Sequence, residues 1–192
     1  MATTKSEGSA RERLLSAANE LFYDEGVHTV GIDRVIERAG VAKASLYGTF
    51  GSKEALVLAY LKLRSETRQR RINERLAQHS KPRARIIALF ELLCELVAEP
   101  TFRGCAFVNA SAEGPRAENK VNATCMDSRA WTKRLLVQLA GDAGAKNPEQ
   151  LGRQLALLYD GAIVAAATDR DPTAAKEALA AVQVLLSAAL RR

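Results

Sequence analysis

The chain has 192 residues, of which 47% are hydrophobic and 5% aromatic, and its 28 basic and 22 acidic side chains give a net charge of +6. A chain of this length can bury a sizeable core, enough for one small and one larger domain. The three cysteines form no C-x-x-C pair and the chain has only two histidines, which argues against a disulfide framework and a zinc site. The longest late apolar run has 13 residues and is too short to span a membrane. We therefore expect a cytoplasmic protein without a metal or other cofactor.

The N-terminal region divides into a polar tail and a first helix. Residues 1–8 are polar, and we expect them to form a disordered tail. Ser9 followed by Glu12 predicts a capping box that opens a helix. This helix should carry one apolar stripe, made of Leu14, Ala18, Leu21 and Phe22, and end before Gly26.

Residues 26–56 predict two short helices joined by a glycine turn. Apolar side chains recur at intervals of three and four from Ile32 to Ala39, and Gly40 follows where a tight turn is needed. The second helix should begin near Ala42 or Lys43 and last about two turns. We expect it to pack inward through Leu46 and Phe50 and to expose a polar face of Lys43, Ser45, Tyr47 and Thr49. A short helix with such a face suits the major groove of DNA.

The same residues resemble the DNA-reading head of the TetR (tetracycline repressor) family. The family pattern is close to T-x-x-x-I-A-x-x-A-G-V-S-K-G-T-L-Y-x-H-F-x-S-K-E-x-L. The chain matches it in order and without a gap at Val35, Ala39, Gly40, Val41, Lys43, Leu46, Tyr47, Phe50, Ser52, Lys53, Glu54 and Leu56. The shorter segments GCAFVNASAE and LALLYDGAIVAA are similar to a subgroup that includes repressors of drug-efflux genes.

The resemblance implies an all-α fold, with a three-helix head that binds DNA and a C-terminal helical domain that binds ligand and dimerises. It covers residues 10–60 by sequence and the remainder by architecture. The implied contacts to a double-stranded DNA operator are Thr29, Gly31, Arg34, Lys43, Ala44, Ser45, Tyr47, Thr49 and Lys53. Lys43 and Lys53 each stand at a helix start, where the helix dipole disfavours positive charge. Contact with a nearby phosphate or guanine therefore explains the presence of these lysines better than helix stability does.

Several of these residues have a second interpretation. Tyr47 is either a DNA contact or a core aromatic, and any single lysine is by default a solvated surface residue. Gly31, Ala42, Gly48 and Thr49 depart from the family pattern. Gly31 lacks the hydroxyl that often opens the first motif helix, although its backbone N–H can still meet a phosphate. We therefore expect the operator to differ from those of commoner family members.

The positive charge is concentrated after the head. Residues 1–60 hold 7 basic and 8 acidic side chains, residues 61–85 hold 9 and 2, and residues 86–192 hold 12 of each. We expect a connecting helix from about Ser52 to Gln78 and interpret the arginines from Arg70 to Arg85 as a solvated face, with a duplex contact from the side as the alternative. Further helices are expected from Pro82 to Glu99, between Gly104 and Gly114, and from Ala117 to Leu139.

The last two predicted helices begin at Pro148 and Pro172 and have broad apolar faces. Small residues on the first allow close helix packing, so two such hairpins from two chains could form a four-helix interface, which is how the family dimerises. The alternative is burial within one chain. The residues expected to form a homodimer are Leu155, Leu158, Ala162, Ala166, Val182, Leu185 and Ala189.

The resemblance also implies a mostly apolar cavity for a small-molecule effector whose binding changes the spacing of two heads. The candidate lining residues, for each of which plain core packing is the alternative, are Phe90, Cys94, Phe107, Asn109, Met126, Trp131 and Tyr159. Cys94, Cys105 and Cys125 are interpreted as small buried side chains, with a redox sensor as the alternative. Asp160 is an acidic residue in an apolar stretch and needs a partner if buried.

We expect domains at 1–8 (tail), 9–56 (helix-turn-helix, with the connecting helix to about 78) and 79–192 (ligand binding and dimerisation). The function expected is a homodimeric, ligand-responsive regulator, most simply a repressor, that binds a palindromic operator and is released by a small apolar or aromatic effector. The alternative is a constitutive DNA-binding protein without an inducer. An enzyme is not expected, because the sequence shows no nucleophile–base pair, metal cluster or phosphate-cradling glycine loop.

Overall fold

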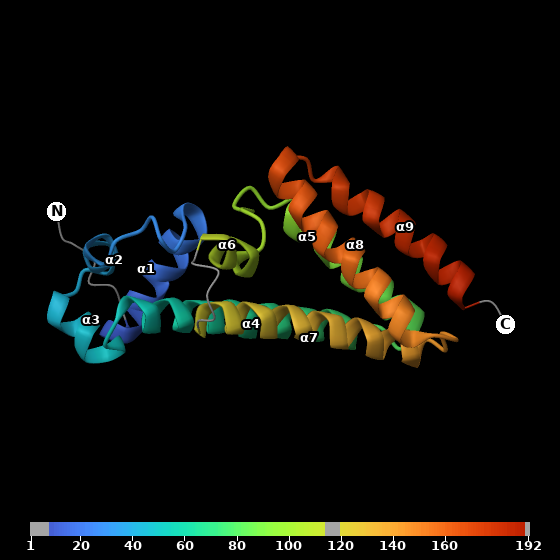
Figure 1. Cartoon of the computed structure of the whole chain (residues 1–192), viewed down its shortest axis with the longest axis horizontal. Coiled ribbons are helices and arrows are strands. Elements are labelled where there is room, and N and C mark those ends of the chain that lie inside the picture. Colours follow the sequence, from blue (N-terminus) through green and yellow to red (C-terminus); the bar gives the residue numbers. More distant parts are fainter. Residues whose placement is uncertain (1–7, 114–119, 191–192) are drawn as a thin grey trace. The chain divides into compact units, whose positions relative to one another are not determined.

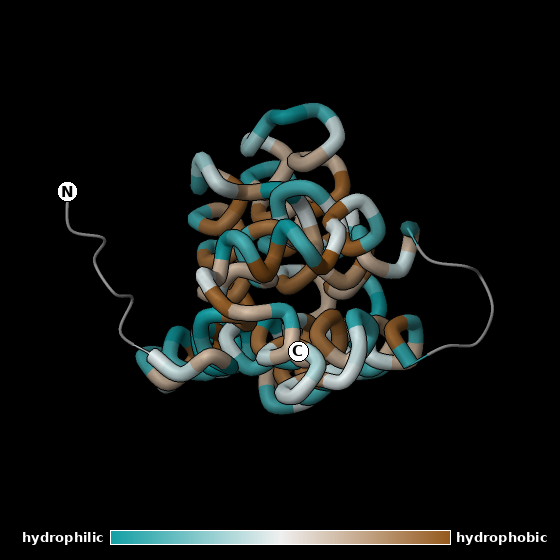
Figure 2. Tube along the Cα trace, turned by 90° about the vertical axis from the view of Figure 1, so that its left-hand side faces the viewer, coloured by the Kyte–Doolittle hydropathy of each residue, from teal (hydrophilic) through white to brown (hydrophobic). Residues whose placement is uncertain are grey.

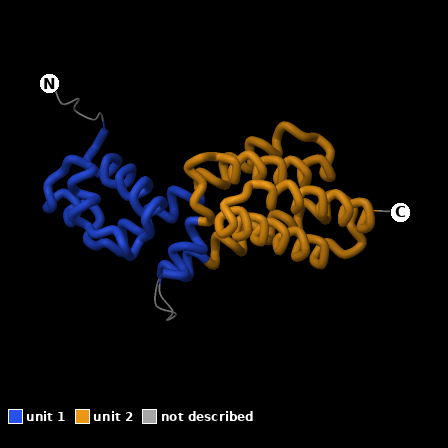
Figure 3. Tube along the Cα trace, turned by 90° about the horizontal axis from the view of Figure 1, so that it is seen from above, with its two compact units in different colours: residues 1–65, 106–125 blue, residues 66–105, 126–192 orange. Residues whose placement is uncertain are grey.

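The computed structural model describes residues 8–113 and 120–190, and within them every regular element is a helix (Figure 1). The chain folds into two compact units, coloured separately in Figure 3. Residues 1–65 and 106–125 form the first, and residues 66–105 and 126–192 form the second. The predicted tail lies outside the described residues, except for Gly8. The fold class predicted from the sequence is confirmed.

The first unit holds α1 (Ala10–Glu25), α2 (Ile32–Ala39), α3 (Lys43–Phe50), the start of α4 (Lys53–Ala77), and α6 (Ala106–Glu113). The predicted capping box is present, because the Glu12 N–H donates to Ser9 Oγ at 3.2 Å and the Ser9 N–H donates to Glu12 Oε2 at 2.7 Å. Inside the unit, the rings of Phe22 and Tyr60 meet edge to face with centroids 5.6 Å apart. Arg64 stacks its guanidinium 3.8 Å from the Tyr23 ring centroid, which ties α4 to α1.

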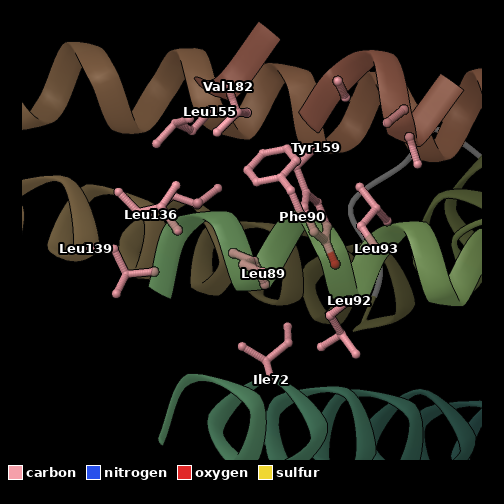
Figure 4. Packing of buried hydrophobic residues seen from close by; sticks show 14 of the residues in the cluster. Ile72, Leu89, Phe90, Leu92, Leu93, Leu136, Leu139, Leu155, Tyr159 and Val182 are labelled. Atoms are coloured by element: carbon pink, nitrogen blue, oxygen red, sulfur yellow. The ribbon is translucent and has the colours of Figure 1, made fainter. Parts of the chain in front are cut away.

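The second unit holds the rest of α4, α5 (Pro82–Val97), most of α7 (Lys120–Asp142), α8 (Pro148–Asp169) and α9 (Thr173–Ala189). Figure 4 shows its core, in which Phe90 of α5 lies against Tyr159 of α8 and Leu155 of α8 lies near Val182 of α9. Figure 2 shows brown apolar residues recurring along the helices, while the turns are mostly teal. This pattern is what amphipathic helices around a shared core require.

Helix boundaries follow the predictions closely. Pro148 opens α8 after Asn147, whose side chain accepts from the Gln150 N–H at 3.0 Å. Pro172 occupies the N-cap position of α9, which begins at Thr173, and Asp171 accepts from the Thr173 N–H at 2.9 Å. The predicted start of α7 at Ala117 lies outside the described residues, and α7 ends at Asp142 rather than Leu139. The helices described are not long and apolar enough to cross a membrane.

Arginines of α4 form ion pairs and a hydrogen bond with other segments of the second unit. Arg71 pairs with Glu99 at 2.9 Å and Arg75 pairs with Glu95 at 2.6 Å, both carboxylates coming from the α5 region. The hydrogen bond from Arg75 lowers the pKa of Glu95. Arg68 donates to Ser128 Oγ of α7 at 2.7 Å. The interpretation of Arg70 to Arg85 as a solvated face holds for Arg71, which is exposed although paired, and is wrong for Arg75, whose side chain is only 22% exposed.

Helices α7 and α8 lie very close together at Gly152. A Cβ placed there would lie 2.5 Å from Val137 Cγ2 and 2.6 Å from Val137 Cα. The second of these atoms is backbone and cannot rotate away. We expect Gly152→Ala to lower the free energy of unfolding by about 1–3 kcal/mol through overpacking. The single tryptophan, Trp131 on α7, reports this unfolding by its fluorescence in urea.

Gly141→Ala is the matched control. It lies on α7, and its Cβ would meet Pro148 at 3.8 Å, an ordinary van der Waals distance. We expect it to be neutral or slightly stabilising, because alanine favours helix more than glycine does. Equal stabilities of the two variants would contradict the close approach of α7 and α8.

Candidate nucleic-acid interface

The turn between α2 and α3 is built around Gly40, whose backbone is left-handed with φ 61° and ψ 43°. Its N–H donates to the Glu37 carbonyl at 3.1 Å, and the Val41 N–H donates to the Ile36 carbonyl at 3.3 Å. This pair of bonds is the Schellman pattern with which helices commonly end at glycine. Side chains strain this backbone region, so the turn needs glycine at that position, which confirms the prediction.

Helix α3 is held by its inner face. Leu46 is fully buried, and the half-buried Phe50 lies under the Arg11 guanidinium, 5.6 Å from the ring centroid. The outer face carries Lys43, Ala44 and Tyr47, and 47% of Tyr47 is exposed. Such an arrangement fixes the orientation of a short helix and leaves the Tyr47 ring and Lys43 exposed on its outer face.

The N-termini of α2 and α3 have no side-chain cap. Gly31 precedes α2 and Ala42 precedes α3, and neither residue supplies a capping hydrogen bond. At α4, by contrast, Ser52 Oγ accepts from the Ala55 N–H at 3.1 Å. The first N–H groups of a helix lack partners within the helix and carry the positive end of its dipole. The backbone N–H groups at both helix starts can therefore donate hydrogen bonds to phosphate oxygens.

The cations of the head are paired with acidic neighbours. Arg34 donates two hydrogen bonds to Glu25, at 2.5 and 2.9 Å, and Lys43 Nζ lies 3.0 Å from Asp33 Oδ1. The hydrogen bond with Asp33 raises the pKa of Lys43. Asp33 also offsets the dipole cost of a lysine at a helix start. These pairs are exposed and therefore weak, so phosphates can replace the carboxylates at little cost.

The nine residues predicted to contact DNA all lie in the first unit. Ser45 and Lys53 are half-buried, and the others are exposed. Besides the ion pairs of Arg34 and Lys43, two contacts of these residues go to backbone carbonyls: the Thr49 hydroxyl donates to the Ser45 carbonyl at 2.6 Å, and Lys53 Nζ donates to the His28 carbonyl at 3.5 Å. Burial lowers the pKa of Lys53, and the Glu113 carboxylate opposes this effect.

Besides Glu25, which pairs with Arg34, the structure adds two acidic residues that the sequence reasoning did not place at the site. Asp33 meets Lys43 across the turn, and Glu113 of α6 accepts from the His28 N–H at 2.9 Å. The position of Asp33 near Lys43 follows from the helix-turn-helix geometry and could have been inferred. Glu113 stands 85 positions from His28, and no local pattern indicates that contact.

The seven predicted effector residues divide between the two units. Phe107 and Asn109 lie on α6 in the first unit, and the other five belong to the second. Phe90 and Tyr159 are buried and touch edge to face at 5.9 Å, and burial raises the pKa of the Tyr159 hydroxyl. The half-buried Cys94 and Trp131 pack against the same core, whereas Met126 is 72% exposed.

Two open pockets lie on the second unit. One, of about 610 Å³, is lined by Val97, Phe102 and Ala166 together with charged residues such as Arg103. The other, of about 480 Å³, lies between α7 and α8 and includes Met126 and Leu157. It also includes Asp160, which accepts from Arg129 Nε at 2.8 Å, so the acidic residue in the apolar stretch has an arginine of another helix as its partner. In the described residues no cluster of His, Cys, Asp or Glu could hold a metal ion.

Four of the residues expected at a dimer interface are buried in the chain's own core, namely Leu155, Ala162, Ala166 and Val182. Leu158, Leu185 and Ala189 are half-buried. The exposed apolar residues of these helices are different ones: Leu157 (66%) and Val164 (49%) on α8, and Val184 (70%) on α9. Sequence reasoning passed over them because they fall outside the main apolar stripe.

A short helix presented on a glycine turn, two uncapped helix starts and exposed cations define a helix-turn-helix protein of the DNA-binding class. Comparison with known proteins agrees. The sequence model for "Bacterial regulatory proteins, tetR family" matches residues 14–60. A TetR-family transcriptional regulator from Streptomyces coelicolor has a similar crystal structure, with 32% identity and a TM-score of 0.90 over 95% of this chain and 96% of that chain.

Two curated relatives carry functional names. The transcriptional repressor NemR of Escherichia coli is 28% identical over 191 residues, covering 94% of this chain and 96% of the relative. The transcriptional activator FasR of Mycolicibacterium smegmatis is 36% identical over 87 residues, covering 45% of this chain and only 40% of the relative. The chain belongs to the TetR family of transcriptional regulators, whose members bind DNA, and these relatives are regulators rather than enzymes.

Two glycine substitutions with opposite expected effects on stability test the left-handed turn at Gly40 and the helical conformation of α3. Gly40→Ala places a side chain at a left-handed residue and should destabilise the head by about 1–2 kcal/mol. Gly48→Ala lies in α3 with no atom near its Cβ and should stabilise that helix by about 0.5–1 kcal/mol. Amide hydrogen exchange of α2 and α3 measures both effects. Slower exchange in Gly40→Ala would show that the turn is not left-handed.

Proposed function

We propose that this protein is a ligand-responsive transcriptional repressor that acts in the bacterial cytoplasm and binds a palindromic operator as a homodimer. The observation that carries the proposal is the exposed face of α3, fixed by Leu46 and flanked by two uncapped helix starts. Similarity to a repressor, NemR, over nearly the whole of both chains supports the direction of regulation.

DNA binding would use the two helix starts and the outer face of α3. Gly31 and Thr29 stand at the start of α2, where backbone N–H groups suit a phosphate. Lys43 and Tyr47 share the outer face of α3, the element that reads base edges in helix-turn-helix proteins. Phosphate contacts would set the register, and the contacts of α3 with base edges would supply the sequence preference.

Dimerisation would use the outer faces of α8 and α9. Leu157 and Val164 are seven residues apart and lie on one side of α8, with the exposed Gly161 between them. Val184 adds an exposed apolar side chain on α9. Two such pairs of helices can form a four-helix interface, and a dimer would present two heads to the two halves of an inverted repeat.

The effector step belongs to the second unit. A small apolar or aromatic effector would bind in the second unit and change the spacing of the two heads, and the pocket that contains Met126 and Leu157 is one place for it. The closed edge-to-face packing of Phe90 on Tyr159 favours the alternative, a constitutive DNA-binding protein whose second unit is a plain core.

Selection of bound duplexes from a random DNA library at moderate salt tests the DNA-binding proposal. Salt weakens nonspecific phosphate contacts and leaves base-specific binding visible. We expect an inverted repeat to be enriched. Lys43→Ala and Tyr47→Ala should each weaken binding to the selected sequence by about 1–3 kcal/mol, the range for one good base contact.

Lys146→Ala is the matched control, because it removes an exposed charge from the α7–α8 turn of the second unit. It should leave operator affinity nearly unchanged. Helicity and dimer formation are checked in every variant by circular dichroism and sedimentation. Undiminished binding in Lys43→Ala and Tyr47→Ala, or a loss explained by unfolding, would refute the roles proposed for these residues.

The dimer can be tested at Val184. Val184→Glu should fold, since the side chain is exposed in the single chain, but it should shift the protein towards monomer because a carboxylate buried at an interface has no partner. Sedimentation velocity measures the shift. Gln183→Glu is the control, because it lies towards the side of α9 where Ser187 contacts Arg83 of α5. A dimer that tolerates Val184→Glu would place the interface elsewhere.

A further inference from the structure

We propose that Glu113, the last residue of α6, is a positioning residue that competes with the DNA phosphate backbone for Lys53 and thereby sets the affinity of the head for DNA. The proposal rests on the DNA-binding function proposed above and adds a regulatory group to it. Glu113 and Lys53 both belong to the first compact unit, as does the segment 26–31 that leads into α2 (Figure 3).

Glu113 is fixed by a hydrogen bond to the backbone of that segment. The His28 N–H donates to Glu113 Oε2 at 2.9 Å. This contact joins α6 to a stretch that carries Thr29 and Gly31, two of the residues proposed to meet DNA. A charged acceptor makes a stronger hydrogen bond than a neutral one, so the carboxylate helps to fix the path of this backbone.

The space around Gly26 shows how closely the carboxylate approaches. A Cβ at Gly26 would lie 2.7 Å from both carboxylate oxygens of Glu113, a distance at which one group has to move. Gly26 also has a φ of 97°, which L side chains rarely adopt. Backbone conformation and the approach of Glu113 therefore both call for glycine at this position.

Lys53 binds the opposite side of the same residue. Its Nζ donates to the His28 carbonyl at 3.5 Å, so the peptide groups of His28 lie between Glu113 and Lys53. Burial lowers the pKa of Lys53, and the charge of Glu113 opposes this shift without reversing it. The ammonium is half-buried beside the segment instead of projecting freely from the start of α4.

A phosphate and Glu113 therefore act on the same ammonium. To reach a phosphate, Lys53 has to leave the His28 carbonyl and give up part of its attraction to Glu113. The negative charge of Glu113 thus holds Lys53 back from the phosphate. Removing this charge while keeping the hydrogen-bond acceptor should favour the phosphate and leave segment 26–31 in place.

Glu113→Gln makes that change, because the amide oxygen can still accept from the His28 N–H. Binding is measured by fluorescence anisotropy over a range of salt concentrations, with a labelled random-sequence duplex and with the selected operator. The expected gain in affinity at low salt is about two- to fivefold on both duplexes, the scale of one exposed ion pair. The salt dependence should steepen by up to about one released counterion, a change that a purely structural role would not produce.

Two further variants test whether the effect of Glu113→Gln depends on Lys53 and on the position of the charge. In a Lys53→Ala background, Glu113→Gln should give no gain in affinity, because the group for which Glu113 competes is absent. Glu99→Gln, which makes the same charge change in the second unit, should have little effect on either duplex. A gain that persists without Lys53, or an unchanged or weaker affinity of Glu113→Gln, would overturn the proposal.

The hydrogen bond itself is tested without DNA. Amide exchange at His28 should be faster in Glu113→Ala and stay protected in Glu113→Gln. Unchanged exchange in Glu113→Ala would refute the contact and with it the proposal. If the wild-type protein enriches an operator but Glu113→Gln changes nothing, only this inference fails. A wild-type protein that binds neither duplex would overturn both proposals.

Discussion

Burial of one leucine determines how the DNA-reading helix is presented. Helix α3 has eight residues, and Leu46 is its one fully buried side chain, supported by the half-buried Phe50 beneath Arg11. A helix this short is not stable by itself, so its orientation comes from tertiary packing. The left-handed turn at Gly40 sets the angle at which α3 meets that core. Lys43 and Tyr47 point outward only because Leu46 points inward.

The head binds an anion although its own charge is slightly negative. Its cations are neutralised locally, Lys43 by Asp33 and Arg34 by Glu25, and these exposed pairs are weak. Net charge thus says little about this surface, and the uncapped starts of α2 and α3 supply a directed attraction that composition does not reveal. A head of this kind should bind nonspecific DNA less strongly than a basic one, because each phosphate displaces a carboxylate.

Sequence reasoning predicted the helices and the motif because both are encoded locally. Ser9 and Glu12, Gly40, and the prolines that begin α5 and α8 act within a few residues of their own positions. Long-range partners are not encoded in this way. Nothing near Arg71 indicates Glu99, and nothing near His28 indicates Glu113. The ion pair of Arg71 and the contact of α6 with segment 26–31 are therefore seen only in the three-dimensional structure.

The sequence of α8 does not separate dimer positions from core positions, for a related reason. An apolar stripe at helical spacing marks a buried face without showing what covers it, and in α8 the main stripe, which includes Leu155, Ala162 and Ala166, is covered by the chain itself. What remains is a second, narrower stripe of Leu157 and Val164 with Gly161 between them. A helix that needs only one covered side would carry polar residues there. The breadth of the apolar surface of α8, more than its main stripe, is therefore the sequence signal that favours a partner.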